Sequence, residues 1–378
     1  MKPTLSWQLR FLRSFLGGNR AAAAPFSLVV DVTSRCNLSC LHCRRHSPHS
    51  TDTAAGKTGA DVLDFPTALF DQLCREAGDW GIRKVVLIGE GEPLLHSGLA
   101  GMIRTAKAAG CEVVLLTNGT MVDEPRATEL VRTGLDELRF SLWASNFEEY
   151  EAQYPGTSTA FFDRTLEGIR HAVAAKDAAA ASRPRIVLHR PMEPRFLDTL
   201  EASLDLAAET GCDAISFSPL KPLLPGDEKR LLTDEQRRDL VPILRGLARV
   251  AKRRGLDHNV AEVVQRLRIG REVWKVLPCH IGWIDVRIRV NGDVVPCDTC
   301  QWVMGNVHTQ GLQEIWNSPG YREFRQLGRS IGGITRSGRH CICDYCCHAT
   351  SNARLHRLLR WLPARTVLGR GSGHVETA

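Results

Sequence analysis

The hydrophobic positions of the chain follow a repeating pattern from residue 26 onward. Short apolar runs rich in β-branched residues alternate with longer stretches whose apolar residues recur at helical spacing. The runs are FSLVVDV (26–32), KVVLIG (84–89), EVVLLT (112–117), ELRFSLW (137–143), RIVLHR (185–190) and AISFSPL (214–220). Continuously apolar strands separated by helices are typical of a parallel sheet buried on both faces. The pattern predicts an α/β fold, a partial, open (β/α)6 TIM-like barrel, over residues 26–232.

The pattern changes after residue 232. Residues 233–254 predict one long helix with Thr233 as its N-cap, and we assign 233–275 to linker helices. Residues 276–350 contain short β-patterned segments, turns and dense cysteines, which indicates a second, smaller domain. Within it, the dipeptide Asn291–Gly292 predicts a hairpin turn. Residues 1–25 and 351–378 form an N-terminal basic amphipathic segment and a basic C-terminal tail.

Positive charge is concentrated at those two ends. The chain of 378 residues has a net charge of +7. Residues 1–20 and 351–370 contain basic residues and no acidic ones, and they account for all of this positive excess. A nucleic-acid-binding protein carries its basic surface on the folded body, so we expect no nucleic-acid partner. Leucines at helical spacing occur at both ends: Leu5, Leu9, Leu12, Leu16, and Leu355, Leu358, Leu359, Leu362. We expect two helices packed on the body; the alternative is a docking surface for a membrane or a partner.

The chain has 13 cysteines and lacks a continuous apolar segment of the kind that starts a secretion signal. No apolar run reaches the ~18 residues of a membrane span. These features favour a cytoplasmic protein with reduced thiols that serve metal or redox chemistry. Cys74, Cys111 and Cys212 are isolated in apolar contexts and are expected to be core residues.

Three of the cysteines occur in the sequence CNLSCLHC (36–43), directly after the first predicted strand. The thiolates of Cys36, Cys40 and Cys43 can converge on one [4Fe–4S] cubane, and three ligands leave one iron open for a small molecule. The alternative is a zinc site that uses His42 or His46 as its fourth ligand.

The C-x3-C-x2-C spacing, the sequence GEGEP (89–93) after the second strand and the strand–helix rhythm together resemble the radical S-adenosylmethionine (SAM) superfamily. Glu90 replaces one glycine of the family's GGEP motif. The resemblance implies that the open iron binds SAM, which is reductively cleaved to a 5′-deoxyadenosyl radical that abstracts hydrogen from a substrate carbon. It also implies a reductant such as flavodoxin or ferredoxin. The implied SAM-binding residues are Gly91, Glu92, Pro93, Asn118 and Ser141.

A second group of seven cysteines lies between residues 279 and 347 and resembles the SPASM or twitch domains of that superfamily. The resemblance implies one auxiliary [4Fe–4S] cluster, and a second is the alternative. The implied ligands are Cys279, Cys297, Cys343 and Cys346. Three cysteines are left over: Cys300, Cys341 and Cys347.

The resemblance implies a radical oxidoreductase, either a dehydrogenase or an epimerase, of natural product biosynthesis. We expect a small polar substrate such as a sugar or an aminocyclitol. Cys300 is the candidate hydrogen donor for epimerisation, and His189 and Arg190 are candidates for the base or for substrate binding. Asp285 and Arg287 are weaker candidates.

Two alternatives remain open. The first is a maturase that modifies a ribosomally synthesised peptide with the same two domains. The 35 residues before Cys36 are too few for a separate leader-binding domain, which disfavours this alternative unless a partner supplies one. The second is a non-enzymatic zinc protein, which the GEGEP sequence and the barrel rhythm disfavour.

Overall fold

The computed structural model describes residues 5–16, 18–50, 63–224, 226–339 and 341–359. Their strands form one ten-stranded sheet with the order β10-β9-β8-β1-β2-β3-β4-β5-β6-β7. The strands are β1 (Ser27–Asp31), β2 (Lys84–Ile88), β3 (Glu112–Thr117), β4 (Glu137–Ser141), β5 (Arg185–Met192), β6 (Ala214–Pro219), β7 (Asp257–His258), β8 (Asp285–Ile288), β9 (Asp293–Val295) and β10 (Gly305–Asn306). The six predicted apolar runs are β1 to β6, which pair in parallel in sequence order. The predicted partial, open barrel is confirmed.

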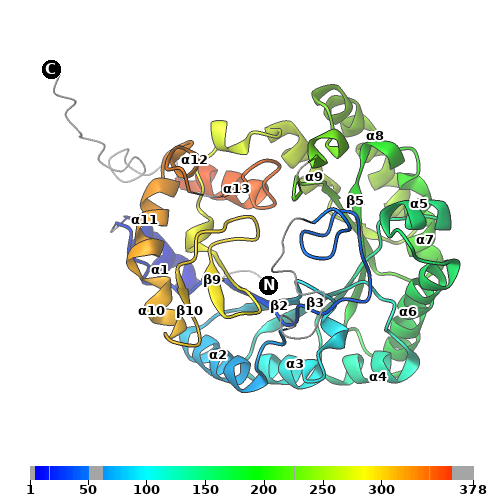
Figure 1. Cartoon of the computed structure of the whole chain (residues 1–378), viewed down its shortest axis with the longest axis horizontal. Helices are drawn as coiled ribbons and strands as arrows, with labels where there is room; N and C mark the ends of the chain where they lie inside the picture. Colours follow the sequence, from blue (N-terminus) through cyan, green and yellow to red (C-terminus); the bar gives the residue numbers. More distant parts are fainter. Residues whose placement is uncertain (1–4, 17, 51–62, 225, 340, 360–378) are drawn as a thin grey trace.

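The helices lie outside the sheet and curve around it, with the strands inside the arc (Figure 1). They are α1 (Leu5–Leu16), α2 (Thr67–Trp80), α3 (Leu99–Ala108), α4 (Glu124–Arg132), α5 (Phe147–Gln153), α6 (Thr159–Ala178), α7 (Leu200–Glu209), α8 (Asp234–Arg253), α9 (Val260–Ile269), α10 (Leu312–Trp316), α11 (Pro319–Gly328), α12 (Gly333–Arg336) and α13 (Ala349–Leu359). Thr233 caps α8 as predicted, through a capping box with Gln236.

Strand β8 joins the cysteine-rich segment to the barrel. It pairs in parallel with β1, from Ser27 opposite Asp285 to Val30 opposite Ile288. It then pairs antiparallel with β9 through the predicted turn, where Gly292 has a φ of 85° that suits a glycine. The sheet is therefore continuous from one predicted domain into the other, and the hairpin stands beside the first strand of the barrel.

Helix α1 packs on the body through a face different from the predicted one. Trp7, Phe11 and Phe15 are buried, whereas the four leucines of the predicted stripe are exposed. The rings of Phe11 and Phe15 contact Trp283, and Phe15 also contacts His280. Aromatic side chains bury more apolar area than leucine, so this face gains more from packing. The prediction of a packed helix is correct, but the leucine stripe faces away from the core.

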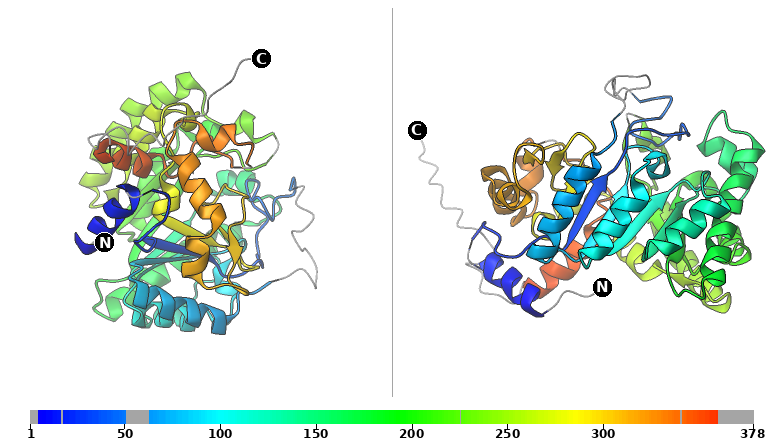
Figure 2. Two further views of the ribbon diagram at one scale, coloured as in Figure 1. Left: turned by 90° about the vertical axis from the view of Figure 1, so that its left-hand side faces the viewer. Right: turned by 90° about the horizontal axis from the view of Figure 1, so that it is seen from below.

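Helix α13 lies beside α1 in both views of Figure 2. Its His356 ring stacks on His280, the residue that Phe15 also contacts. Leu359 is buried and Leu358 is exposed, while the predicted Leu362 lies outside the described residues. None of the described helices combines the length and hydropathy that a membrane crossing requires.

Candidate active site

The loop that follows β1 holds the first three cysteines. Cys36, Cys40 and Cys43 are partly buried, and the Cys43 backbone N–H donates to the Cys40 carbonyl oxygen over 3.0 Å. Burial raises the pKa of all three thiols, that of Cys36 to about 12, and repulsion from neighbouring thiolates adds to the effect at Cys36 and Cys40. Three thiols that share one buried space need a positively charged group to become thiolates. An iron–sulfur cluster fits this donor set.

Neither histidine of the zinc alternative completes a site with these cysteines. The ring of His42 lies 3.1 Å from the Asp227 carboxylate, and its centroid is 5.7 Å from that of Trp143. The Nε2 atom of His46 lies 2.9 Å from the Ser34 carbonyl oxygen. In the described part of the chain, no group of three His, Cys, Asp or Glu side chains is close enough to hold a single metal ion. Both histidine rings thus have other partners, which favours the cluster over the zinc alternative.

The GEGEP segment is fixed against the residues that precede the cysteine loop. The Gly91 N–H donates to the Thr33 carbonyl over 3.0 Å, and the Glu92 N–H donates to the Arg35 carbonyl over 2.6 Å. A Cβ at Gly91 would lie 1.9 Å from the Arg35 oxygen, and one at Gly89 would lie 2.6 Å from the Gly91 oxygen. Close backbone approach thus requires glycine at 89 and 91. The intervening Glu90 carries its side chain away and pairs with Arg45, which explains why a glutamate is tolerated there.

The Glu92 carboxylate is buried and already bound by donors of the chain. It accepts hydrogen bonds from the Thr117 hydroxyl over 2.7 Å, the Asn118 N–H over 2.7 Å and the Leu94 N–H over 3.1 Å. Burial raises its pKa, and these hydrogen bonds oppose the rise. The carboxylate therefore ties the segment to the end of β3, and its predicted contact with the SAM amine remains a proposal.

The other two implied SAM contacts lie on the same rim. Asn118 donates from Nδ2 to Asn37 Oδ1 over 2.9 Å, which links the loop after β3 to the cysteine loop. Ser141 ends β4, and its hydroxyl accepts a 3.0 Å hydrogen bond from Trp143 Nε1. Both side chains thus lie at carboxyl ends of parallel strands, where ligands bind in such sheets.

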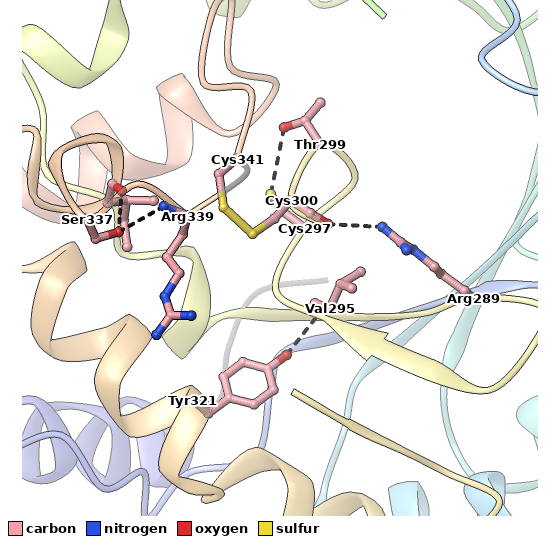
Figure 3. Close-up of a disulfide and its surroundings, with 10 residues drawn as sticks. Arg289, Val295, Cys297, Thr299, Cys300, Tyr321, Ser337, Arg339 and Cys341 are labelled. Carbon is pink, nitrogen blue, oxygen red and sulfur yellow. Dashed lines mark hydrogen bonds between the residues drawn. A yellow bond between two sulfur atoms is a disulfide. The ribbon is translucent and has the colours of Figure 1, made fainter. Parts of the chain in front are cut away.

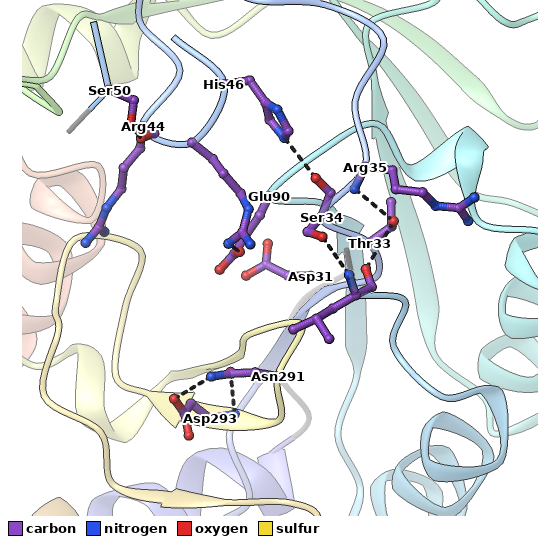
Figure 4. Close-up of polar contacts among 12 residues, drawn as sticks. Asp31, Thr33, Ser34, Arg35, Arg44, His46, Ser50, Glu90, Asn291 and Asp293 are labelled. Atoms are coloured by element: carbon purple, nitrogen blue, oxygen red, sulfur yellow. Dashed lines mark hydrogen bonds and ion pairs between the residues drawn. The ribbon is translucent and has the colours of Figure 1, made fainter. Parts of the chain in front are cut away.

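A cavity of about 620 Å³ separates the cysteine loop from the hairpin. Its lining includes Asp31, Cys43, Glu90 and Arg287, and Figure 4 shows Arg44 and Glu90 on the side opposite the hairpin residue Asn291. The Arg287 guanidinium forms a two-point ion pair with Asp31, at 2.8 and 2.9 Å, and also pairs with Asp298. Arg287 was a weaker candidate in the sequence, and the structure places it in the wall of this cavity.

Cysteines of the second group line two other cavities. Cys297 and Cys347 line an interior cavity of about 380 Å³, together with Lys221, Asp298 and His348. On another side, Cys279, Cys343 and Cys346 line a small cavity of about 30 Å³. Burial together with charge repulsion from Cys297, Cys343 and Cys347 raises the pKa of Cys279, and burial together with repulsion from Cys347, Cys279 and Cys297 raises the pKa of Cys346. The four predicted ligands therefore lie near one another, and Cys347 lies with them.

The surroundings of these thiols distinguish Cys347 from the predicted four. Burial raises the pKa of Cys297 to about 12 and that of Cys343 to about 11. Burial also acts on Cys347, but the neighbouring His348 and Lys221 cations lower its pKa to about 6. The sequence analysis left Cys347 over from the four implied ligands, although it lies directly beside Cys346. The donor set fits a closed four-cysteine cluster, with a fifth thiolate beside it.

Cys300 and Cys341 form a disulfide in the structure (Figure 3). Cys300 is fully buried, and its carbonyl oxygen accepts a 3.1 Å hydrogen bond from Arg289. A disulfide sulfur carries no hydrogen atom to donate, so Cys300 could act as the hydrogen donor only after reduction of this pair, and that role stays a prediction. The expectation of uniformly reduced thiols is wrong for the same pair.

His189 and Arg190 point to opposite faces of β5, because side chains alternate along a strand. His189 lies 3.4 Å from the Ser216 hydroxyl and 3.3 Å from the Ser218 hydroxyl. Burial and nearby cations, including Arg139, lower its pKa to about 3, which makes it a weak base at neutral pH. The structure thus disfavours the predicted role of His189 as a base.

Arg190 lies on the other face, where its guanidinium pairs with Glu149 at 2.7 Å in a fully buried ion pair. It lines none of the cavities described above. This ion pair holds α5 against β5 and gives Arg190 a structural role, and its predicted part in catalysis stays a prediction. Asp285, the other weaker candidate, lies on β8 and lines the interior cavity beside Cys297 and His348.

Comparison with known proteins agrees with this geometry. Residues 30–178 match the model of the radical SAM superfamily, and residues 279–348 match that of the SPASM iron–sulfur cluster-binding domain. The PqqA peptide cyclase of Xanthomonas euvesicatoria is 27% identical over 317 residues, which are 79% of this chain and 75% of the relative. The AdoMet-dependent heme synthase of Methanosarcina barkeri is 25% identical over 339 residues, 85% of this chain and 89% of the relative.

Solved structures show the same fold at lower identity. Streptococcus suis SuiB bound to S-adenosylmethionine has a TM-score of 0.63 at 15% identity and covers 84% of this chain and 71% of its own. The anSMEcpe protein with bound AdoMet has a TM-score of 0.61 at 14% identity and covers 89% of this chain and 98% of its own.

A partial α/β barrel with one cysteine triplet at its rim and a second cysteine group beside it defines an iron–sulfur enzyme. This chain is a radical SAM enzyme with a SPASM domain. Its two domains imply a [4Fe–4S] cluster, S-adenosylmethionine and auxiliary iron–sulfur chemistry.

Proposed function

We propose that this enzyme modifies a ribosomally synthesised peptide. The observation that carries the proposal is the similarity to the PqqA peptide cyclases, which extends over both domains. These relatives favour a peptide over the sugar or aminocyclitol substrate that the sequence analysis expected.

Different residues around the cavity of about 620 Å³ would bind the two clusters and SAM. Cys36, Cys40 and Cys43 would hold the SAM-binding cluster, and the GEGEP backbone would hold the methionyl group of SAM. When bound, these cofactors supply reductive cleavage of SAM and hydrogen-atom abstraction. Cys279, Cys297, Cys343 and Cys346 would hold the auxiliary cluster. Four protein ligands would leave no iron free to bind the substrate, and the cluster would supply a one-electron acceptor.

The placement of the cavity supports this division. Cys43 lines the cavity at one end, and Asp298, the neighbour of Cys297, lines it at the other. Asp298 also lines the interior cavity that contains Cys297 and Cys347. A substrate bound in the larger cavity would therefore lie between the two cysteine groups, where both hydrogen abstraction and electron removal are within reach.

Oxidation or epimerisation of a small polar molecule is the second candidate function. The cavity volume falls within the ~300–1,000 Å³ typical of small-molecule sites, and its walls are strongly charged. The similarity to a heme synthase also shows that relatives of this chain include an enzyme not named for a peptide.

One experiment separates the two candidates. Anaerobically reconstituted enzyme with dithionite and SAM is incubated with synthetic peptides encoded beside its gene, and in parallel with a panel of sugars and aminocyclitols. The proposal predicts 5′-deoxyadenosine together with a mass change in a peptide. A mass change confined to the small molecules would replace it with the second candidate.

A further inference from the structure

The lining of the large cavity contains more positively charged side chains than negatively charged ones. Its lining contains three carboxylates, from Asp31, Glu90 and Asp298, and each already has a cationic partner. Glu90 pairs with Arg45, and Asp31 pairs with Arg287. Asp298 pairs with Arg287 and with Lys221. The lining contains two further guanidinium groups, those of Arg44 and Arg289.

Neither of these two arginines forms an ion pair with a carboxylate in the described part of the chain, although Glu90 and Asp293 lie near enough to Arg289 to oppose the lowering of its pKa by burial. Arg289 donates one hydrogen bond, to the Cys300 carbonyl oxygen over 3.1 Å, which uses one of its five N–H groups. No ion pair joins Arg44 to a described carboxylate. Both side chains are partly buried, so water compensates their charge only in part.

Arg44 and Arg289 come from opposite walls of the cavity. Arg44 follows Cys43 directly in the cysteine loop, and Arg289 follows strand β8 just before the hairpin turn. Figure 4 shows Arg44 extending from the loop on the side of the cavity that faces the hairpin. They are close enough that Arg44 lowers the pKa of Arg289, an effect second only to burial. Two like charges that face one cavity leave a place for an anion between them.

We propose that Arg44 and Arg289 bind a carboxylate of the substrate, supplied by a glutamate or aspartate side chain of the peptide. A guanidinium matches a carboxylate through two parallel N–H···O bonds, and a carboxylate has acceptor positions for two such partners. Binding there would relieve the repulsion between the two arginines. It would also place the acidic residue beside Cys43, next to the proposed SAM site. This inference rests on the proposed peptide substrate and specifies its chemical class.

The probes are two libraries of random eleven-residue peptides that differ only at the central position, which is glutamate in one and glutamine in the other. Anaerobically reconstituted holoenzyme with SAM is immobilised, and the retained peptides are quantified by mass spectrometry. We expect the wild-type protein to favour the glutamate library by about tenfold, the effect of a hydrogen-bonded charge pair. The double variant Arg44→Gln/Arg289→Gln should bring this ratio to about one.

Two further variants separate binding from folding. Arg44→Lys/Arg289→Lys keeps both charges but loses the planar fork, so its ratio should lie between the other two. Arg104→Gln removes an exposed arginine on α3 and should keep the wild-type ratio. The iron content of each variant shows whether its fold is retained.

The possible failures are distinguishable. Equal retention of both libraries by the wild-type protein would refute the carboxylate site and leave the peptide function standing. A glutamate preference that persists in the double glutamine variant would assign the site to other residues. Retention of neither library would overturn the peptide substrate and this inference together.

Discussion

Asp31 on β1 and Arg287 on β8 form a two-point ion pair, with N–O distances of 2.8 and 2.9 Å. The two residues are 256 positions apart in the sequence, and their strands pair in parallel. Asp31 is fully buried at the carboxyl end of the first barrel strand. The contact therefore joins the barrel to the hairpin of the SPASM segment beneath the large cavity, and it sets the position of one wall relative to the other.

Removal of one partner of this pair should be costly. Asp31→Asn removes one of the negative charges that compensate the buried Arg287 guanidinium. Loss of one partner of a buried pair destabilises a protein by about 3–5 kcal/mol. The free energy of unfolding in urea, measured on reconstituted protein, tests this. The control Arg104→Gln, which removes an exposed pair with Glu129, should change it by less than about 1 kcal/mol. A similar small change in Asp31→Asn would contradict the structural role.

Arg190 should matter for stability and not for SAM cleavage. Arg190→Met leaves Glu149 buried without its partner and should cost about 3–5 kcal/mol in the free energy of unfolding. The double variant Glu149→Gln/Arg190→Met removes both charges and should recover part of that loss. Formation of 5′-deoxyadenosine per folded molecule should equal that of wild type, and its disappearance would return Arg190 to the active site.

Iron content should report on the two cysteine groups separately. Wild-type protein with one auxiliary cluster should bind about eight irons, because each cubane contains four. Cys40→Ala should bind about four and form no 5′-deoxyadenosine, and Cys279→Ala should also bind about four. The buried core residue Cys212 provides the control, since Cys212→Ala should keep all eight. About twelve irons in wild type would indicate a second auxiliary cluster.

The disulfide predicts a simple labelling result. Protein stripped of iron and alkylated in denaturant without reductant should leave two of its 13 cysteines unlabelled. Cys300→Ala should leave none, because Cys341 then becomes a free thiol. Mass spectrometry of the intact chain reads both numbers. Complete labelling of the wild-type chain without reductant would show that the pair is reduced, and would reopen the assignment of Cys300 as a hydrogen donor.

His189 should make stability fall in mild acid. Its folded pKa is lowered to about 3, against about 6.5 in the unfolded chain, so only the unfolded state gains a proton between these values. Stability from this group is fully present above about pH 6.5 and falls by about 1.4 kcal/mol per pH unit below it. Urea unfolding at several pH values should show a shallower slope for His189→Gln. The exposed His258 offers a control, and His258→Gln should keep the wild-type slope.

Local sequence was sufficient for the features that depend on local physics. The apolar runs that became β1 to β6 had to be buried on both faces, and the pattern alone predicted a parallel sheet. The cysteine triplet could be predicted as a cluster site from the sequence because its three cysteines lie within one loop. Their short separation along the chain keeps them close together in the fold. The Asn291–Gly292 turn followed from the positive φ that glycine permits.

The sequence was insufficient where a role depends on which face a side chain occupies. His189 and Arg190 are adjacent in sequence, yet one faces the interior and the other pairs with Glu149 on α5. The leucine stripe of α1 has helical spacing, but the aromatic face of the same helix covers the core. Periodicity reveals that a helix has distinct faces, and only the shape of its partner decides which one is buried.

The sequence by itself determined the class of enzyme, because the cysteine loop and the GEGEP segment each carry their chemistry within a few residues. The tertiary structure decided which distant groups meet. It paired Cys300 with Cys341, placed Cys347 in one cavity with Cys297, and left Arg44 and Arg289 facing another cavity without an ion pair to a described carboxylate. The meeting of Arg44 and Arg289 depends on the parallel pairing of β8 with β1, which brings together residues more than 250 positions apart, and no local pattern encodes that pairing.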